Sequence, residues 1–324
     1  MSLINRFTLI TCSALAISTG MSGAQAQYPE RPIRIVVSTS PGGGADVTAR
    51  LLAPGLSEKL GKSVIVENRP GASGMIAGDY VARQPADGYT FLFDITTFAV
   101  NPSLYKEMPY KPLVDLVPVT QIIQAPNVLV VHPSIPVNTV QEFIAYVKSK
   151  NGDLAYASSG NGSAQHLAAE LFKERTGVQM IHVPYKGGGP ALSDVMAGHV
   201  PAFFAFLSSA APHIKSGRLK AIAVTGKTRS ALLPDIPTIA ESGLPGYEVY
   251  DFNGLFAPAG TPRAAIERVQ RDLAATLSIP SVRAQLDAIG AEPLGSTPDA
   301  FEAFLRSEIA KWGDVIKKAG VKVE

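Results

Sequence analysis

The 324-residue sequence is poor in cysteine, in tryptophan and in net charge. Its one cysteine, Cys12, leaves no second thiol for an internal disulfide or a thiolate metal site, so the fold must depend on its apolar core. A formal net charge of only +2 argues against a nucleic-acid partner, because nucleic-acid-binding proteins carry a strongly basic surface. Beyond the N-terminal segment, no apolar stretch is long enough to span a bilayer.

Catalytic motifs are also missing. The segment 71–75 (GASGM) resembles a nucleophile elbow but lacks its closing glycine, and residues 42–44 are not followed by the Gly-Lys of a phosphate-binding loop. The five histidines show no zinc-binding spacing. The sequence therefore predicts no catalytic residue, no metal and no cofactor. An exported hydrolase using Ser163 and His166 is the alternative from another class.

Residues 1–26 have the pattern of a cleavable signal peptide. Arg6 gives a positive start, residues 7–17 are apolar, and residues 24–26 (AQA) match the small-x-small cleavage pattern. A membrane anchor fits less well, because the apolar stretch is too short to span a bilayer. A lipoprotein signal also fits less well, because apolar sequence continues past Cys12. Cleavage removes one cation and no acid, so the net charge falls from +2 to +1. The predicted location is the bacterial periplasm.

Short apolar runs alternate with amphipathic stretches along the remaining chain, which favours an α/β fold with mostly parallel sheets. The expected strands are residues 33–37, 64–67, 91–93, 127–131, 154–157, 180–183, 200–206, 219–224 and 255–257. The expected helices are residues 47–60, 75–83, 140–150, 166–176, 190–197, 264–277, 282–289 and 298–318.

Two glycine-rich loops, residues 40–46 and 158–166, each lie between an expected strand and an expected helix. This arrangement aims backbone N–H groups and the positive end of a helix at an anion, so the sequence predicts two jaws closing on one acidic ligand. The expected ligand-binding residues of the loops are Ser40, Gly42, Gly43, Gly44, Ser158, Ser159, Gly160, Asn161, Gly162 and Ser163. Valine at Gly43 or Gly162 is expected to fill the anion position, and Asp46 is expected either to cap the helix or to hold the first loop in shape.

Taken together, nine motifs in order resemble one family over nearly the whole chain after residue 26. They are PGG at 41–43 with Asp46, VENRPGA at 66–72, ADGYT at 86–90, NPSLY at 101–105, the second glycine loop running into His166, VPYKG at 183–187, PHI at 212–214, LPDIPT at 233–238 and GLFAPAGTP at 254–262. The chain resembles the Bug-type extracytoplasmic solute receptors, the substrate-binding components of tripartite tricarboxylate transporters.

The resemblance implies a type II-like periplasmic binding protein fold, in which two α/β lobes, each with a mostly parallel sheet, face each other across a cleft. Lobe 1 would comprise residues 27–131 and 251–324, and lobe 2 residues 132–250. Hinges are expected near residues 131–133 and 250–254, where the chain crosses between lobes.

The resemblance also implies a function. A monomeric receptor would capture a small organic acid between the two glycine loops, often through bridging waters, and deliver it to the membrane subunits of a transporter. Presentation of the ligand to a sensor kinase is the alternative output. Thr96 and Tyr185 are expected near the cleft.

Four positions depart from the family pattern and are expected to set the ligand type. Thr39 stands where an aromatic residue is common, and Ala205-Phe206 stands where an Asp-Asn pair is common. Phe206 would favour an aromatic or hydrophobic acid if it lines the pocket, with packing in the core as the alternative. Asp94 stands where a small residue is common, and it would either accept from a ligand hydroxyl or amine or cap the next turn.

Overall fold

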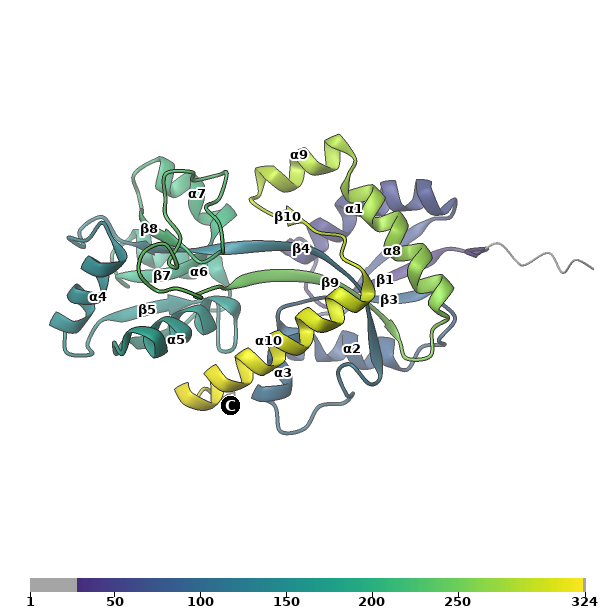
Figure 1. The fold of residues 1–324 in the computed structure, drawn as a ribbon, viewed down its shortest axis with the longest axis horizontal. Helices are drawn as coiled ribbons and strands as arrows, with labels where there is room; N and C mark the ends of the chain where they lie inside the picture. The colour runs from purple at the N-terminus through teal and green to yellow at the C-terminus, as the bar shows by residue number, and fades with distance from the viewer. Residues whose placement is uncertain (1–27, 323–324) are drawn as a thin grey trace, which may run out of the picture.

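The computed structural model describes residues 28–322 and arranges them in two α/β lobes (Figure 1), so the predicted signal peptide lies outside the described residues. The strands are β1 Ile33–Val37, β2 Val64–Asn68, β3 Thr90–Ile95, β4 Leu116–Val131, β5 Ala155–Ser158, β6 Ile181–Pro184, β7 Ala202–Phe206, β8 Lys220–Val224, β9 Tyr250–Pro258 and β10 Glu292–Pro293. The helices are α1 Gly44–Leu60, the short η1 Ala72–Gly74, α2 Met75–Ala82, α3 Thr97–Leu104, α4 Val140–Ser149, α5 Ala164–Thr176, α6 Gly188–Met196, α7 Leu207–Lys215, α8 Arg263–Leu277, α9 Pro280–Ala288 and α10 Pro298–Ala319. Within this part of the chain, no helix has the length and apolarity that a membrane crossing requires.

The strands pair in the order β2-β1-β3-β9-β4-β7-β5-β6, and β8 and β10 also pair with β4. In lobe 1, β1 is parallel to β2 and β3; in lobe 2, β5 is parallel to β6 and β7. Among the strands of residues 28–322, only β4 and β9 connect the two groups, and they run antiparallel to each other. In sheets of this kind ligands bind outside the carboxyl ends of the parallel strands, where both glycine loops lie.

β4 carries the first crossing between the lobes. Its residues 116–126 pair with β9, whereas residues 127–131 pair with β7 and β8. The crossing therefore lies at Pro126–Asn127, before the hinge expected at 131–133. The first part of this strand was missed because Pro118 and neighbouring polar residues interrupt the apolar pattern, and the pairing register does shift after Pro118.

Two helices, α3 and α7, were also missed, and each contains a proline. Pro102 and Pro212 each remove one backbone donor from the helix interior, which costs about 3 kcal/mol in an exposed helix. Packing overrides this cost, because Phe98 and Val100 on α3, and Leu207 and Ala210 on α7, are buried. The low intrinsic helix propensity of these two segments therefore does not prevent them from forming helices.

Helix α10 lies along both lobes and packs against α3 of lobe 1 and α5 of lobe 2 (Figure 1). Leu305 and Trp312 on α10 share one buried apolar cluster with Phe98 of lobe 1 and Phe172 of lobe 2. Helix α10 therefore packs on both lobes, whereas the sequence assigns everything after residue 251 to lobe 1.

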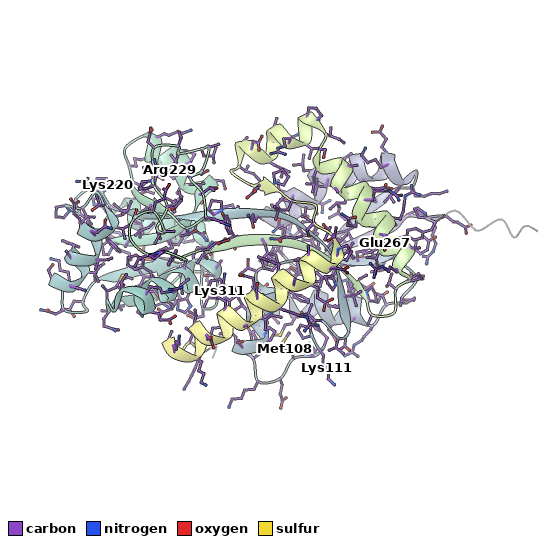
Figure 2. The ribbon with its side chains drawn as sticks, in the orientation of Figure 1. Met108, Lys111, Lys220, Arg229, Glu267 and Lys311 are labelled. Carbon is purple, nitrogen blue, oxygen red and sulfur yellow. The ribbon has the colours of Figure 1, made fainter. Side chains whose placement is uncertain are left out.

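Polar contacts between α10 and lobe 2 add to this apolar packing. Lys311 lies over the middle of the molecule, where the two lobes meet (Figure 2), and its Nζ donates to the carbonyl of Glu248 at 3.4 Å. Near the C-terminal end of α10, Lys318 pairs with Glu174 on α5 at 2.6 Å. The second contact is exposed and contributes little energy, so the shared apolar cluster is what joins the lobes on this side.

Leu305→Ala tests the shared cluster. Because Leu305 is fully buried, we expect the free energy of unfolding to fall by about 2–5 kcal/mol. Urea unfolding followed by fluorescence of Trp312, the chain's one tryptophan, and by circular dichroism should give a single coincident transition. Lys317→Ala, on the exposed side of the same helix, should change the free energy by less than about 0.5 kcal/mol. Two separate transitions in the wild-type protein would show that the lobes do not share a core.

Candidate functional site

The first glycine loop connects β1 to α1 and is held by Asp46. The N–H of Gly42, a residue with φ of +78°, donates to Asp46 Oδ2 at 2.8 Å. Arg50 Nε donates to the other carboxylate oxygen at 2.9 Å. Although burial opposes the charged form, these hydrogen bonds hold the pKa of Asp46 below its ordinary value. Asp46 shapes the loop, as its place at the start of the helix predicts.

The first turn of α1 is open. Within residues 28–322 no side chain caps it, and the first helical bond runs from the N–H of Val47 to the carbonyl of Gly43. The N–H groups of Gly44, Ala45 and Asp46 precede that bond and therefore lack partners inside the helix. These donors lie at the positive end of a 17-residue helix, an arrangement that suits an anion.

The three glycines of this loop face different surroundings. A Cβ atom built on Gly42 or Gly44 would meet no atom of the described chain within 4 Å. A Cβ atom on Gly43 would lie 3.2 Å from the carbonyl oxygen of Ser40 and 3.5 Å from Thr39 Oγ1. Valine at Gly43 would therefore press on its own loop. Gly42 and Gly44, not Gly43, border the open space.

The second glycine loop connects β5 to α5 and touches lobe 1. Gly160 and Gly162 have φ of +126° and +73°. A Cβ atom on Gly162 would collide with the side chain of Leu104 on α3. Valine at Gly162 would thus press on α3 of lobe 1 and take a strained left-handed φ, whereas the sequence suggested that it would fill the anion position.

The serine hydroxyl groups of the second loop differ in burial and in hydrogen bonding. Ser158 is fully buried, and its Oγ lies 2.6 Å from His182 Nε2 and 3.1 Å from the N–H of Gly160. Ser163 caps α5 by accepting the N–H of His166 at 3.2 Å. These two serines hold the loop together, which differs from the ligand contact expected of them. Ser159 is half-buried and Asn161 is exposed, so their side chains face outward, as does the exposed Ser40 of the first loop.

Among the expected specificity positions, Ala205 and Phe206 are packing residues. Ala205 is fully buried in the apolar cluster under α6 and α7. Phe206 is half-buried and packs against the lobe 1 cluster that lies under α1, α8 and α9. Ala205 is therefore enclosed in the core of lobe 2, which differs from the ligand contact expected of it, and Phe206, for which core packing was the alternative, packs at a contact between the lobes.

Asp94 is fully buried below the loop 71–74. Ser38 Oγ donates to its Oδ1 at 2.6 Å and the N–H of Ile95 at 2.8 Å, while Oδ2 finds no partner within residues 28–322. Burial raises the pKa of Asp94 to about 6, and the hydrogen bond from Ser38 opposes this shift. The loop above it contains Ala72 and Ser73 at φ of 47° and 52°, a conformation that non-glycine residues seldom adopt.

Tyr185 directly follows β6 and is hydrogen-bonded to the second glycine loop. Its N–H donates to the carbonyl of Ser158 at 3.0 Å, and its hydroxyl donates to Asp194 Oδ2 at 2.6 Å. Partial burial, followed by the bond to Asp194, raises the pKa of Tyr185 to about 12. The hydroxyl of Tyr185 therefore bonds to α6, which contains Asp194.

A polar network at the crossing was not predicted. Gln165 Nε2 on α5 donates to Asp251 Oδ2 at 2.9 Å and to Asn127 Oδ1 at 3.0 Å, and Thr96 Oγ1 lies 3.4 Å from Asp251 Oδ1. Burial raises the pKa of Asp251 to about 6. The four residues come from distant parts of the sequence and form no local motif, so no sequence signal identifies them. Thr96 lies here, at the crossing between the lobes.

The rings of His132, His166 and His182 each take part in a hydrogen bond within the fold. Within the described residues, no group of three or more His, Cys, Asp or Glu side chains is placed to hold a metal ion. His166 accepts the N–H of Gly162 through Nδ1 at 3.1 Å, so its ring serves the loop and not the Ser163 hydroxyl. Two serine hydroxyls lie close to a histidine ring: Ser134 lies 2.7 Å from His132 at an exposed site, and the fully buried Ser158 lies 2.6 Å from His182.

Comparison with known proteins identifies the family. Residues 48–321 match the profile described as "Tripartite tricarboxylate transporter family receptor". The chain is 39% identical to Protein BugT of Bordetella pertussis over 299 residues, which is 92% of each chain. It is also similar to the solved structure of R. palustris Rpa4515 with adipate, at 40% identity and a TM-score of 0.80, covering 91% of this chain and 99% of that one. MatC from Rhodopseudomonas palustris with bound malate is 31% identical, with a TM-score of 0.76 and coverage of 89% and 100%. The chain therefore belongs to the receptor family of tripartite tricarboxylate transporters, the Bug-type solute-binding proteins.

Proposed function

We propose that this protein binds a small organic carboxylate between its two lobes and delivers it, chemically unchanged, to the membrane subunits of a tripartite tricarboxylate-type transporter. The observation that carries the proposal is the open first turn of α1, where three N–H groups lack partners inside the helix and the first of them belongs to Gly44, which borders open space. Adipate and malate are the acids named for two similar structures.

The binding residues in this proposal come from both lobes. While Gly42, whose N–H is held by Asp46, and the other residues predicted for the loops keep them in shape, Ser40 and Gly44 of lobe 1 and Ser159 and Asn161 of lobe 2 contact the ligand. All of them are neutral donors, which suits a ligand that must be released, since a bidentate arginine would hold a carboxylate more strongly. The packing of Phe206 against lobe 1 favours an aliphatic acid over an aromatic one.

The cellular location, the oligomeric state and the lobe boundaries in this proposal are those predicted from the sequence. Residues 1–26 direct export and are removed, so the receptor acts in the periplasm. It acts there as a monomer. Lobe 1 is formed by residues 27–131 and 251–324 and lobe 2 by residues 132–250, except that the crossing lies at Pro126–Asn127 and α10 belongs to both. Ligand contacts from both loops stabilise the closed form of the cleft.

A thermal-shift screen tests the ligand class. Adipate and malate should raise the melting temperature, because a ligand that binds only the folded state at 100 times its Kd adds about 2.7 kcal/mol of stability. Adipamide, which lacks both charges, is the control and should have no effect. Benzoate and phenylacetate test the aromatic class. The absence of a shift with every acid would reject the proposed function.

Gly44→Leu tests the anion position. Gly44 is the first residue of α1 and borders open space, so leucine should leave the fold intact while its side chain blocks the free N–H groups. We expect adipate affinity to fall by at least about tenfold with no loss of thermal stability. Ser281→Leu, which adds the same side chain to the exposed first turn of α9, is the matched control and should bind normally. Equal binding by the Gly44 variant would place the ligand elsewhere.

A further inference from the structure

Both glycine loops contain the same local hydrogen bond. In each, a glycine two residues before the helix donates its N–H to the side chain four residues later, which is the third residue of the helix. The pairs are Gly42 with Asp46 Oδ2 at 2.8 Å and Gly162 with His166 Nδ1 at 3.1 Å. The two glycines have nearly the same left-handed φ, +78° and +73°. Asp46 and His166 are 3% and 4% exposed, so neither side chain is available for direct contact with a ligand.

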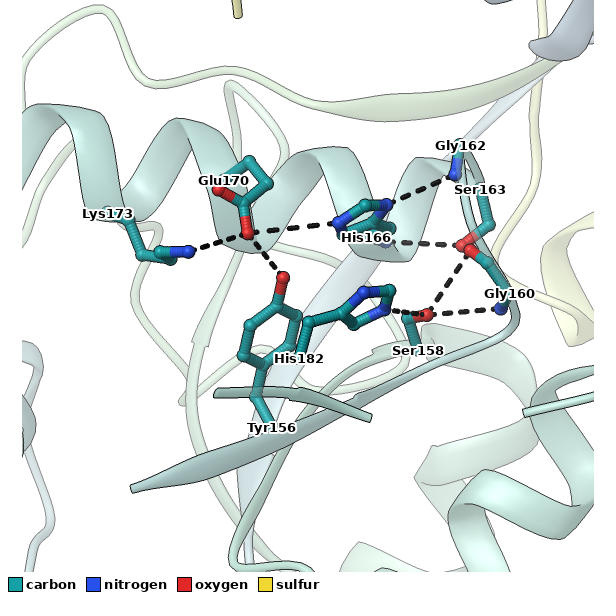
Figure 3. Close-up of polar contacts among 9 residues, drawn as sticks. All are labelled: Tyr156, Ser158, Gly160, Gly162, Ser163, His166, Glu170, Lys173 and His182. Carbon is teal, nitrogen blue, oxygen red and sulfur yellow. Dashed lines mark hydrogen bonds and ion pairs between the residues drawn. The ribbon is translucent and has the colours of Figure 1, made fainter. Parts of the chain in front are cut away.

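His166 can fill this role only as a neutral ring. A backbone N–H is always a donor, so Nδ1 of His166 carries no proton and the ring hydrogen lies on Nε2. Nε2 faces Glu170 Oε1 at 3.8 Å, and that carboxylate is itself paired with Lys173 at 2.8 Å (Figure 3). Burial, followed by the neighbouring His182 and Lys173, lowers the pKa of His166 to about 3.

His182 supports the other end of the second loop. Its ring stacks on that of His166 with centroids 3.8 Å apart and planes 7° from parallel, and the ring of Tyr156 lies beside the pair, with its centroid 5.1 Å from that of His182 and 6.4 Å from that of His166 (Figure 3). His182 Nε2 contacts Ser158 Oγ, which accepts the N–H of Gly160. Burial lowers the pKa of His182 to about 4. The stacked pair thus fixes two backbone N–H groups of one loop.

The two loops solve one electrostatic problem in different ways. A carboxylate below an anion site would repel the ligand, but Asp46 is neutralised by Arg50 at 2.9 Å. In the second loop the acceptor is a neutral imidazole, so no counter-charge is needed. Neither loop therefore presents a net negative charge below the ligand.

We propose that Asp46 and His166 are matched positioning residues: each fixes one glycine loop by accepting a glycine N–H, so carboxylate affinity depends on both although neither touches the ligand. This inference rests on the proposed function, because the loops are taken as the carboxylate site. His182 is a positioning residue for the second loop through its contacts with His166 and Ser158.

Paired substitutions test the proposal. Asp46→Ala and His166→Ala remove the acceptor, and we expect adipate affinity, measured by calorimetry, to fall by at least about tenfold. Asp46→Asn and His166→Asn keep an oxygen acceptor near the same place and should bind within about threefold of wild type. Rescue by asparagine separates loop positioning from a general loss of stability.

Helix α4 supplies the matched control. Its third residue, Glu142, accepts the N–H of Asn138 at 2.6 Å in the same arrangement, but at the far end of lobe 2 and without a glycine loop (Figure 1). Glu142→Ala should leave adipate affinity unchanged. If it weakens binding as much as His166→Ala does, or if both alanine variants bind like wild type, the proposal is overturned.

Amide hydrogen exchange gives a readout that needs no ligand. In the wild-type protein the amides of Gly42 and Gly162 should be protected, each alanine variant should lose protection at its own glycine, and each asparagine variant should retain it. If His166→Ala does not fold, His166→Asn and His166→Asp decide the question: both should protect Gly162, but the aspartate should weaken adipate binding by repulsion. An unprotected Gly162 amide in the wild type refutes the proposal. Failure of adipate and all other acids to bind would instead reject the proposed function.

The pH dependence of stability tests the neutral state of His166. The ionisable groups around it are His182 on β6, Tyr156 on β5, and Glu170 and Lys173 on its own helix. Its folded pKa of about 3 lies below the ordinary 6.5, so between these values the unfolded chain binds a proton that the folded protein does not. Stability from this group is therefore lost as the pH falls from about 6.5 towards 3.

The urea midpoint of His166→Asn should accordingly fall less between pH 7 and pH 4.5 than that of the wild type. Asp94 and Asp251, whose raised pKa values favour the folded state on acidification, are present in both proteins and cancel in the comparison. Parallel pH profiles for the two proteins would contradict a neutral His166.

Discussion

The antiparallel pairing of β4 with β9 is the constraint on which the arrangement of the site depends. β4 continues without a break from one sheet into the other, and β9 returns beside it. The last residue of β3, Ile95, lies opposite Asn253, and the last residue of β7, Phe206, lies opposite Asn127. The parallel strands of both lobes therefore end near the same crossing. Loops that follow these strands converge although more than a hundred residues separate them in the sequence.

Two kinds of contact limit how the lobes can move about this crossing. On the side of α3, α5 and α10, one apolar cluster is continuous through both lobes, so opening there would expose buried area at about 25 cal/mol per Å². At the crossing itself, Gln165 links α5 to both strands through Asp251 and Asn127. Movement that keeps these contacts must pivot near α10. The opening is then largest on the opposite side of the cleft.

The sequence predicted the parts of the structure that local chemistry determines. Both glycine loops, the strands before them and the helices after them lie where the pattern placed them, as does the role of Asp46, because glycine and a nearby acceptor are local signals. What could not be predicted is how each polar atom is used. Ser158 and His182 are 24 residues apart, and only the pairing of β5 with β6 brings them together. Ala205 is buried because the helices α6 and α7 cover β7, which no feature of its neighbours in sequence indicates.

The chemistry of the loops has a consequence for release. Each helix terminus attracts a carboxylate by only about 0.3–1 kcal/mol at an exposed site, with backbone hydrogen bonds adding to this, whereas a buried arginine pair would add more. A ligand held by neutral donors therefore needs both loops at once to be retained, and it loses most of its contacts when the lobes separate. The contact between Gly162 and Leu104 lies on this path, because it brings the second loop against α3 of lobe 1. A receptor of this kind can bind firmly when closed and release when opened, without any change in the charge of its own side chains.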